Sequence, residues 1–279
     1  MGAIRVVTDS ASDLDASVAR DQGVDIVGLD VRLGDIGPDV TRTWSPEEFW
    51  QNCASSPSLP ETSAPSPGAF AEAFGRAADD GADGVVCITL SSVLSATYQS
   101  ACAGAAEVAD RIPVRVVDSL SVTMGEGLTV LEAAQLAASG ADLDTVSAAL
   151  DALKGRVHVY GTLDTLDNLK KGGRIGGAQA FVGSLLSIKP VVVVQDGKVE
   201  PESKQRTRSR SLEYLASKLN NAGELERVAV VHAEAPDVGT LVNLIARDFD
   251  RDKILVSYVG PVIGTHCGPR TIGLCYIVK

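Results

Sequence analysis

Histidine is scarce in this 279-residue chain, which limits the metal chemistry available to it. The three histidines, His158, His232 and His266, lie far apart and have no cysteine or carboxylate partner at the spacing of zinc ligands. His158 and His232 fall within apolar runs typical of strands, where a hydrogen-bonded core side chain is the simpler interpretation. We therefore expect neither a structural nor a catalytic metal, and no organic cofactor.

Cysteine and long hydrophobic runs are also limited. The five cysteines are odd in number, widely spaced and mostly embedded in apolar runs, which is typical of reduced thiols in a cytosol. The most apolar stretch, residues 178–194, is interrupted by Lys189 and Pro190 and is shorter than the roughly 20 residues that span a bilayer. Residues 1–8 lead into an apolar strand pattern without a basic region or cleavage site. These features predict a cytoplasmic protein without integral membrane contact.

Basic residues are fewer than acidic ones, 25 against 36, which gives a formal net charge of -11. The electric field of a protein with this negative charge repels phosphate backbones and anionic membranes, so nucleic acid is not an expected partner. Glycine is abundant, yet neither nucleotide fingerprint is present. Arg174 occupies the second glycine that a dinucleotide loop requires, and Leu274 and Cys275 stand where a P-loop needs Lys and Ser or Thr.

Apolar runs of four to seven residues alternate with segments of helical period, which indicates a largely parallel sheet covered by helices. In the second half, Asp196 and Gly197 between two short strand patterns predict a hairpin, and hence a mixed sheet. The expected strands are 4–7, 26–31, 85–90, 114–117, 157–161, 191–194, 228–231, 254–259 and 272–278. The expected helices begin near 13, 46, 67 and 96 or cover 125–138, 143–153, 208–219 and 238–249, with a polar loop over 53–65.

The length of the chain is close to the size at which single cores divide, so two domains are expected. Residues 1–156 are predicted to form an N-terminal three-layer α/β/α domain with a mostly parallel sheet. Residues 157–279 are predicted to form a C-terminal α/β sandwich with a mixed sheet. The fold class is therefore α/β in both halves.

Hydroxyl side chains gather at the expected ends of strands. Because the carboxyl ends of strands border the ligand crevice of an open α/β sheet, three of these clusters should line one edge. Helix capping is the alternative, and it is the preferred explanation for Ser10 and Ser66. It does not suffice for residues 91–97, which hold more hydroxyls than one cap needs. The clusters cover residues 8–13, 62–66, 91–97 and 118–121.

Two further segments carry candidate functional residues. His266 lies among glycines and prolines in residues 259–269, after an apolar strand, which predicts a sharply bent backbone that presents the imidazole. A basic run follows the hairpin in an otherwise acidic protein. A solvated helix start explains Arg210, whereas Lys204 and Arg206 are candidates for binding an anionic or protein partner.

Six motifs, taken in order, resemble the signature of the DegV family. They extend from residue 8 to residue 269 and so cover nearly the whole chain, and six motifs in one order are far more specific than any single one. The motifs are Thr8-Asp9-Ser10, Thr62-Ser63-x-Pro65-Ser66, Ser91-Ser92-x-Leu94-Ser95-x-Thr97-Tyr98-Gln99-Ser100-Ala101, Leu169-Lys170-Lys171-Gly172-Gly173-Arg174-Ile175, Lys204-x-Arg206 and Gly260-Pro261-Val262-Ile263-Gly264-Thr265-His266.

This resemblance implies a two-domain protein with a long-chain fatty acid, such as palmitate, in a buried tunnel. Members of the family serve as fatty-acid-binding subunits that present the acyl carboxylate to a separate ATP-dependent fatty acid kinase, which makes acyl phosphate. The chain itself would then not be an enzyme, and Lys204 and Arg206 would bind the kinase. By the same resemblance Thr62 and Ser95 contact the carboxylate, His266 joins their hydrogen-bond network, and Ser63 and Thr97 are second choices.

Two positions depart from the family pattern, since Ala96 and Arg270 stand where glycine is usual. The energetics still suit the assignment, because burial of a 16-carbon tail contributes on the order of 10 kcal/mol before association costs. An unpaired carboxylate in an apolar site costs several kcal/mol, which donors from Thr62, Ser95 and a protonated His266 would offset. With only 4% aromatic residues, the chain suits an aliphatic tunnel better than a site for planar ligands.

Two alternatives remain open at this stage. In a serine hydrolase acting on an acyl ester, Ser95 would be the nucleophile and His266 the base, with Asp118 or Asp9 orienting the histidine. The Gly-x-Ser-x-Gly elbow of such enzymes does not occur in the sequence. The other alternative is an interaction protein whose crevice is empty.

Overall fold

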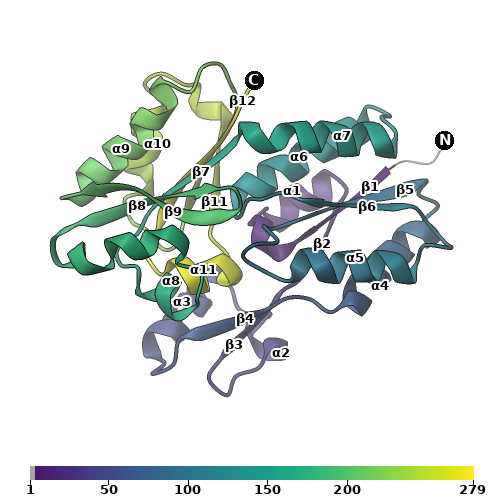
Figure 1. Ribbon diagram of the computed structural model, residues 1–279, viewed down its shortest axis with the longest axis horizontal. Helices are drawn as coiled ribbons and strands as arrows, with labels where there is room; N and C mark the ends of the chain where they lie inside the picture. Colours follow the sequence, from purple (N-terminus) through teal and green to yellow (C-terminus); the bar gives the residue numbers. More distant parts are fainter. Residues whose placement is uncertain (1–3) are drawn as a thin grey trace. The chain divides into compact units, whose positions relative to one another are not determined.

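The computed structural model describes residues 4–279, with side chains for all of them except 183–187 (Figure 1). The chain divides into two compact units. The first contains the chain up to Asp30 together with Ser63–Arg156, and the second contains Val31–Thr62 together with Val157–Lys279. The domain boundary expected after residue 156 would place residues 31–62 in the N-terminal domain, whereas the structure groups them with the second unit.

The first unit is built on a four-stranded sheet of order β2-β1-β5-β6 in which every pair is parallel. Its elements are β1 Ile4–Asp9, η1 Ser10–Ser12, α1 Ala16–Asp21, β2 Val24–Val27, α4 Pro67–Asp79, β5 Gly84–Thr89, α5 Thr97–Glu107, β6 Val114–Asp118, α6 Met124–Ala138, α7 Leu143–Leu153 and η2 Lys154–Arg156. Helices α4 and α5 pack on one face and α6 and α7 on the other (Figure 1). The predicted three-layer α/β/α architecture is confirmed.

The central strand shows why this sheet forms. All six residues of β5 are buried, as expected for a parallel strand covered on both faces. Phe70 and Phe74 of α4 pack beneath it and are fully buried. The helix begins where the sequence indicates, because Ser66 accepts a hydrogen bond from the Ala69 amide at 3.2 Å and Pro67 occupies the first turn.

The second unit contains a six-stranded sheet of order β11-β10-β12-β7-β8-β9, and its mixed character confirms the prediction. Only β10 and β11 are parallel, and the remaining pairs are antiparallel. Its main elements are β7 Val157–Thr162, α8 Asp167–Lys171, η3 Gly176–Ser187, β8 Lys189–Gln195, β9 Lys198–Gln205, α9 Arg208–Asn220, β10 Leu225–His232, α10 Val238–Ile245, η4 Arg251–Lys253, β11 Ile254–Tyr258, α11 Pro261–Cys267 and β12 Ile272–Val278.

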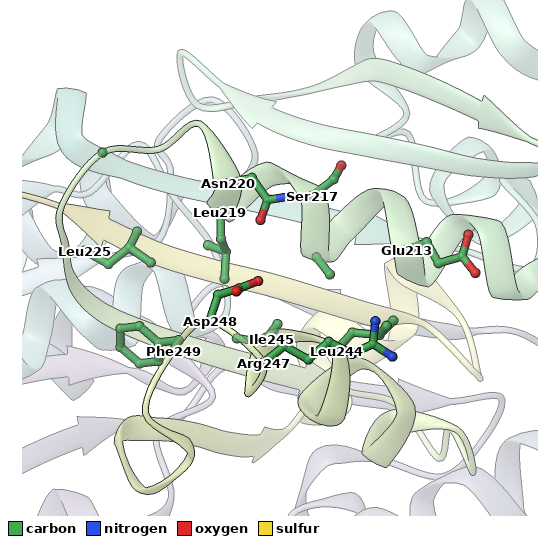
Figure 2. A pocket seen from close by; sticks show the side chains of 12 residues that line it. Glu213, Ser217, Leu219, Asn220, Leu225, Leu244, Ile245, Arg247, Asp248 and Phe249 are labelled. Carbon is green, nitrogen blue, oxygen red and sulfur yellow. The ribbon is translucent and has the colours of Figure 1, made fainter.

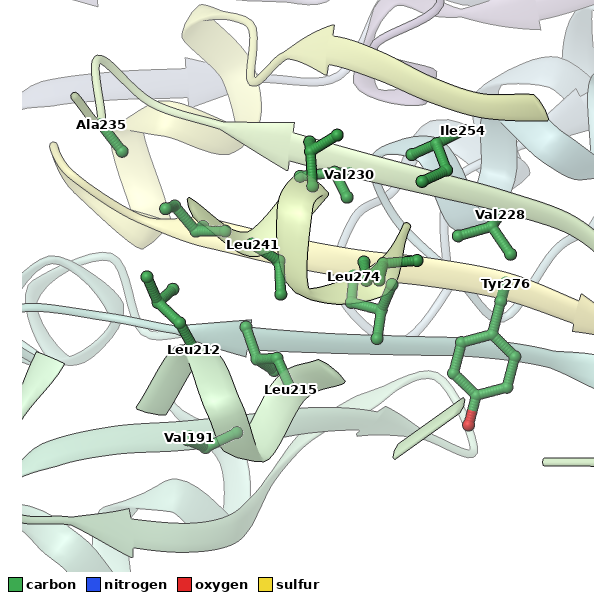
Figure 3. Close-up of a cluster of buried hydrophobic side chains, with 13 residues drawn as sticks. Val191, Leu212, Leu215, Val228, Val230, Ala235, Leu241, Ile254, Leu274 and Tyr276 are labelled. Atoms are coloured by element: carbon green, nitrogen blue, oxygen red, sulfur yellow. The ribbon is translucent and has the colours of Figure 1, made fainter. Parts of the chain in front are cut away.

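Helices α9 and α10 cover one face of this sheet and form its core (Figure 3). Leu212 and Leu215 of α9 and Leu241 of α10 point toward the strands and meet Val230 and Leu274. All five side chains are 2% exposed or less, so the apolar stripe of each helix is buried as its period predicts.

Residues 31–62 explain most of the differences from the sequence prediction. They contain α2 Pro38–Thr41 and α3 Pro46–Ser55, flanked by strands β3 Asp30–Leu33 and β4 Pro60–Ser63, which pair with each other. The expected strand 26–31 is therefore two strands, and the expected loop 53–65 contains β4. Phe49 and Trp50 of α3 pack so closely on α11 that a methyl group at Gly264 would lie 2.8 Å from the Trp50 ring. This contact ties α3 to the second unit.

Candidate functional site

Three of the hydroxyl-rich clusters lie at one edge of the parallel sheet. Strands β1, β5 and β6 are neighbours, and the clusters follow their carboxyl ends. Two aspartates connect the loops there. One Asp9 oxygen accepts a hydrogen bond from the Leu90 amide at 2.9 Å, and Asp118 accepts one from the Ser92 amide at 3.1 Å. The predicted gathering of polar groups at this edge is present, and carboxylates hold it together.

The loop 91–97 has an internal hydrogen-bond network. The Ser95 and Thr97 hydroxyls lie 2.8 Å apart, and the Ser95 hydroxyl also accepts from the Thr97 amide at 3.3 Å. Thr97 is fully buried, whereas Ser95 is partly exposed. The structure thus brings two of the predicted residues together, with Ser95 as the more accessible of the pair.

Several residues at this edge adopt left-handed backbone conformations. Asp13, Leu120 and Thr123 have φ values of 50°, 51° and 49°. Thr123 is β-branched, so this conformation is costly. It is held by a hydrogen bond from its hydroxyl to Asp13 at 2.6 Å and by one from its amide to the Ala11 carbonyl at 2.9 Å. Strain of this kind gathers at binding and catalytic sites, which favours a functional role for this edge.

Ser10 does not cap a helix as expected, because its hydroxyl accepts a hydrogen bond from the Leu29 amide at 2.9 Å. The cap of the short helix η1 is Asp9, which accepts from the Ala11 amide at 2.8 Å. Asp9 therefore holds both η1 and the strand end at Leu90. Ser63, the remaining hydroxyl candidate, is exposed at the end of β4.

In the second unit, Thr62 and His266 form a preassembled pair. The Thr62 hydroxyl and His266 Nε2 lie 2.9 Å apart. Residues 261–267 form the helix α11, with Pro261 in its first turn. The prediction of a sharply bent backbone around His266 is therefore wrong. Proline at a helix start and the glycines within the segment are compatible with a short helix. The helix, rather than a bend, orients the imidazole.

The other ring nitrogen of His266 faces a glycine. A methyl group at Gly172 would lie 2.4 Å from His266 Nδ1, so the imidazole occupies the place where any other residue would put its Cβ. Nδ1 is buried and has no hydrogen-bond partner among the residues whose side chains are described. Gly172 ends α8, where Arg174 donates a hydrogen bond to its carbonyl at 2.7 Å.

His266 is neutral in this environment. Burial, and secondarily the Arg174 charge, lower the pKa of its imidazole from 6.5 to about 4. The expected protonated His266 is therefore wrong for the unliganded protein. An N–H at Nδ1 would be a buried donor without an acceptor, which is costly, so we assign the proton to Nε2. Nε2–H then donates to the Thr62 oxygen, which leaves the Thr62 hydroxyl proton available to another acceptor.

The sequence analysis did not assign roles to Asn168 and Gly172. Asn168 donates a hydrogen bond to the Thr265 carbonyl at 3.1 Å and so fixes α11 against α8. Both residues belong to the segment around the Lys170-Lys171-Gly172-Gly173 sequence. Its paired glycines were a signal for close backbone approach, but their partner could not be known without the fold.

The other histidines lie in aromatic contacts. His158 stacks on Tyr276 with ring centroids 4.8 Å apart, and His232 lies 4.3 Å from Tyr258. Burial lowers the pKa of both imidazoles. In the part of the chain that the structure describes, no group of three or more His, Cys, Asp or Glu side chains is arranged to hold a metal ion. No helix among the described residues is long and apolar enough to cross a bilayer.

The basic run divides into residues with different surroundings. Arg208 is 15% exposed and forms an ion pair with Asp237 at 2.9 Å, which makes it part of the structure. Lys204 is exposed, and its ammonium group lies 4.9 Å from the centroid of the Phe181 ring. Arg206 is also exposed, just beyond the end of β9. Lys204 and Arg206 are thus placed as surface cations.

A groove of about 680 Å³ lies between α9 and α10 (Figure 2). Leu219, Leu244 and Phe249 line its apolar part, and Glu213 and Asp248 add acidic side chains. It contains none of the residues predicted from the sequence. We assign it no function.

The serine hydrolase alternative requires Asp9 or Asp118 to orient His266, and both carboxylates have other hydrogen-bond partners. Asp9 accepts backbone hydrogen bonds from Ala11 and Leu90, and Asp118 accepts them from Ser92 and Leu120. Both carboxylates therefore serve the loop backbone rather than an imidazole, which a catalytic triad would require.

Fold and site together define a two-unit α/β protein that carries hydroxyl pairs already assembled for hydrogen bonding. The model of the DegV family, described as "Uncharacterised protein, DegV family", matches residues 3–279. The chain belongs to the DegV family, which confirms the resemblance found in the sequence. A DegV domain-containing protein of Listeria innocua is 34% identical over 280 residues, covering 99% of each chain.

Solved structures show the same fold. A DegV family protein from Thermus thermophilus, described as fatty-acid-binding, has a TM-score of 0.89 and 33% identity and covers 99% of this chain and 100% of its own. DegV from Bacillus subtilis, described as a fatty acid binding protein, has a TM-score of 0.85 and 29% identity over 100% of both chains. These relatives match the whole length of the chain, so no unit lacks a counterpart.

Proposed function

We propose that this chain binds a long-chain fatty acid in a buried tunnel and holds its carboxylate through side-chain hydroxyls. The Thr62–His266 hydrogen bond, 2.9 Å long, is the observation that carries the proposal. A neutral imidazole that donates to Thr62 leaves the threonine proton for an anionic acceptor. The fatty-acid-binding relatives from Thermus thermophilus and Bacillus subtilis support the choice of ligand.

Five residues named from the sequence are the proposed contacts. Thr62 and His266 belong to the second unit, and Ser63, Ser95 and Thr97 belong to the first. Ser95 is preferred over Thr97 because Thr97 is fully buried and already bonded to Ser95. A hydrogen bond to a charged acceptor contributes about 1.5–3 kcal/mol, so two or three such donors offset much of the cost of burying the carboxylate.

The apolar tail supplies most of the affinity in this proposal. At about 0.8 kcal/mol per buried CH₂, a 16-carbon chain contributes on the order of 10 kcal/mol before the costs of association. Extraction of lipids from protein purified without denaturant, followed by mass spectrometry, tests the proposal directly. A bound straight-chain fatty acid is the expected product. Protein that carries no lipid and takes up none from palmitate solution would refute it.

Ser95→Ala is expected to weaken fatty acid binding by about tenfold, because a buried carboxylate oxygen loses one donor. Palmitate affinity measured by titration of delipidated protein gives the magnitude. Ser139→Ala is the matched control, since its exposed hydroxyl bonds only the Leu136 carbonyl of its own helix end. Equal affinity in the Ser95 variant and the wild type would remove Ser95 from the site.

The same proposal assigns catalysis to a separate ATP-dependent fatty acid kinase, to which this chain presents the carboxylate. Lys204 and Arg206 are the proposed contacts, because both are exposed cations in a chain of net charge -11. A cytoplasmic location belongs to the proposal, since the kinase uses ATP. None of the five cysteines, all of them described by the structure, forms a disulfide, which agrees with a reducing compartment.

Arg206→Ala is expected to leave palmitate binding unchanged and to lower acyl phosphate formation by the kinase several-fold, through weaker association. Arg210→Ala is the matched control, because Arg210 is exposed on the first turn of α9. Acyl phosphate is measured with the loaded protein, the kinase and ATP. Equal rates for the two variants would show that Arg206 does not contact the kinase.

A further inference from the structure

Two carboxyl groups meet in the interior of the first unit. Asp9 ends β1, and Glu126 lies in the first turn of α6; both are 0% exposed. The Thr8 hydroxyl donates to Glu126 Oε1 at 3.0 Å, and the carboxyl groups of Glu126 and Asp9 are within hydrogen-bonding reach of each other. Fully buried acids are rare unless they are paired with a donor or a cation.

The hydrogen bonds at the two groups are unequal. Both oxygens of Asp9 are occupied by backbone donors, Oδ1 by the Ala11 amide at 2.8 Å and Oδ2 by the Leu90 amide at 2.9 Å. Glu126 Oε2 is buried and receives no hydrogen bond from any donor among the described side chains and backbone. Two carboxyl groups can bond each other only if one of them carries a proton. The backbone donors favour the ionised form of Asp9, so the proton belongs to Glu126.

The surroundings oppose a second negative charge. The titratable groups that face the pair are Asp13, after η1, and Cys87, on β5, and each would add negative charge if ionised. Burial raises the pKa of Asp9 to about 7, against the opposing effect of its backbone hydrogen bonds, so Asp9 is mostly ionised above neutral pH. Burial and the Asp9 charge raise the pKa of Glu126 well above its ordinary value. Burial therefore outweighs the preference of a helix N-terminus for an anion.

We propose that Asp9 and Glu126 share one proton, carried by Glu126, and that the ionised Asp9 is a positioning residue for the loop 91–97. Asp9 acts through the Leu90 amide, one residue before that loop. Ser91 continues the chain of contacts, since its carbonyl accepts from the Ser95 amide at 3.1 Å. Only the consequence for ligand binding depends on the proposed function, because Ser95 is one of the proposed fatty acid contacts.

Infrared spectroscopy tests the shared proton without any lipid. At about pH 9, where Asp9 is ionised, the folded wild type is expected to show the carbonyl band of a protonated carboxylic acid, and Glu126→Gln is expected to lack it. The glutamine keeps both roles of the acid, because its amide donates to Asp9 and its oxygen accepts from Thr8. A wild-type spectrum without the band would overturn the proposal, and this measurement does not require any variant to fold.

The pH dependence of unfolding gives a second test. The folded state keeps the Glu126 proton above the ordinary pKa of 4.5, whereas the unfolded chain loses it there. Between about pH 5 and pH 7 the unfolding equilibrium constant of the wild type should therefore rise up to tenfold per pH unit relative to Glu126→Gln. Parallel pH profiles of the two proteins would contradict a proton held by Glu126.

The positioning role is tested with Asp9→Asn. The amide offers one acceptor where the carboxylate offered two, so either the Leu90 or the Ala11 amide loses its partner. Hydrogen exchange at Leu90 and across 91–97 should become at least tenfold faster, and palmitate affinity should fall. Unchanged exchange would refute the positioning role. Faster exchange with unchanged palmitate affinity would retain that role and instead count against Ser95 as a fatty acid contact.

Discussion

Gly172→Ala is expected to lower palmitate affinity by about ten- to hundredfold and to cost about 1–3 kcal/mol of unfolding free energy. The added methyl group would lie 2.4 Å from His266 Nδ1 and 3.1 Å from the Asn168 carbonyl oxygen. Because the carbonyl belongs to helix α8, the imidazole must move, and its 2.9 Å hydrogen bond to Thr62 is then lost. Titration with palmitate and denaturant unfolding measure the two effects.

The backbone at Gly172 does not itself require glycine. Its φ of -75° and ψ of -5° are allowed for alanine, so the expected loss comes from the contact with His266 alone. Gly239→Ala is the matched control in the same unit, because an added methyl group there meets no atom within 4 Å and α10 would gain helix propensity. A Gly172 variant that binds and unfolds like this control would show that the imidazole does not depend on the missing side chain.

The layered architecture was predictable because its signals are local. A parallel strand covered on both faces must be apolar along its length, and β5 is buried at every residue. The hairpin between β8 and β9 follows from Asp196 and Gly197, which adopt the positive φ values of 48° and 75° that the turn needs. Each of these features depends on fewer than ten consecutive residues.

The errors arose where tertiary contacts override local pattern. Residues 259–269 look like a bent loop because they contain glycine and proline, yet Gly264 is small so that Trp50 can pack against the helix α11. The strand β4 lies in a segment rich in Ser and Pro and is stabilised by pairing with β3. Neither partner could be identified without knowing that residues 31–62 join the second unit.

In the candidate site, too, the local features were predictable from the sequence and those that depend on tertiary contacts were not. Which residue types gather at the strand ends followed from the sequence, as did the grouping of Ser95 with Thr97. Protonation states did not, because they depend on burial and on partners distant in the chain. Glu126 reads as an ordinary acid in the first turn of a helix, and only the fold places it against Asp9. His266 was expected to carry a charge that its burial removes.

Acidification is expected to weaken the second unit through His266. The unfolded chain binds a proton at this position near pH 6.5, whereas the folded state resists protonation until about pH 4. Stability due to the neutral imidazole is therefore complete above pH 6.5 and declines as pH falls toward 4, by up to about 3 kcal/mol. Denaturant unfolding between these pH values should show this loss as a change in the difference between the wild type and His266→Gln, because the glutamine amide does not titrate.

The comparison with His266→Gln isolates the imidazole, because Asp9 and Glu126 titrate in the same pH range with the opposite sign and are unchanged in this variant. The pKa of Asp237 is held below its ordinary value of 3.8 by Arg208, so its contribution is lost only at lower pH. A carboxylate bound beside the imidazole would raise the pKa of His266 by favouring its charged form. Palmitate should therefore reduce the acid-induced loss in the wild type and leave the His266→Gln profile unchanged in slope. If the slope of unfolding free energy against pH in the wild type is the same with and without palmitate, the carboxylate lies away from His266. If the unliganded wild type and His266→Gln have equal slopes, the fold does not hold the imidazole neutral.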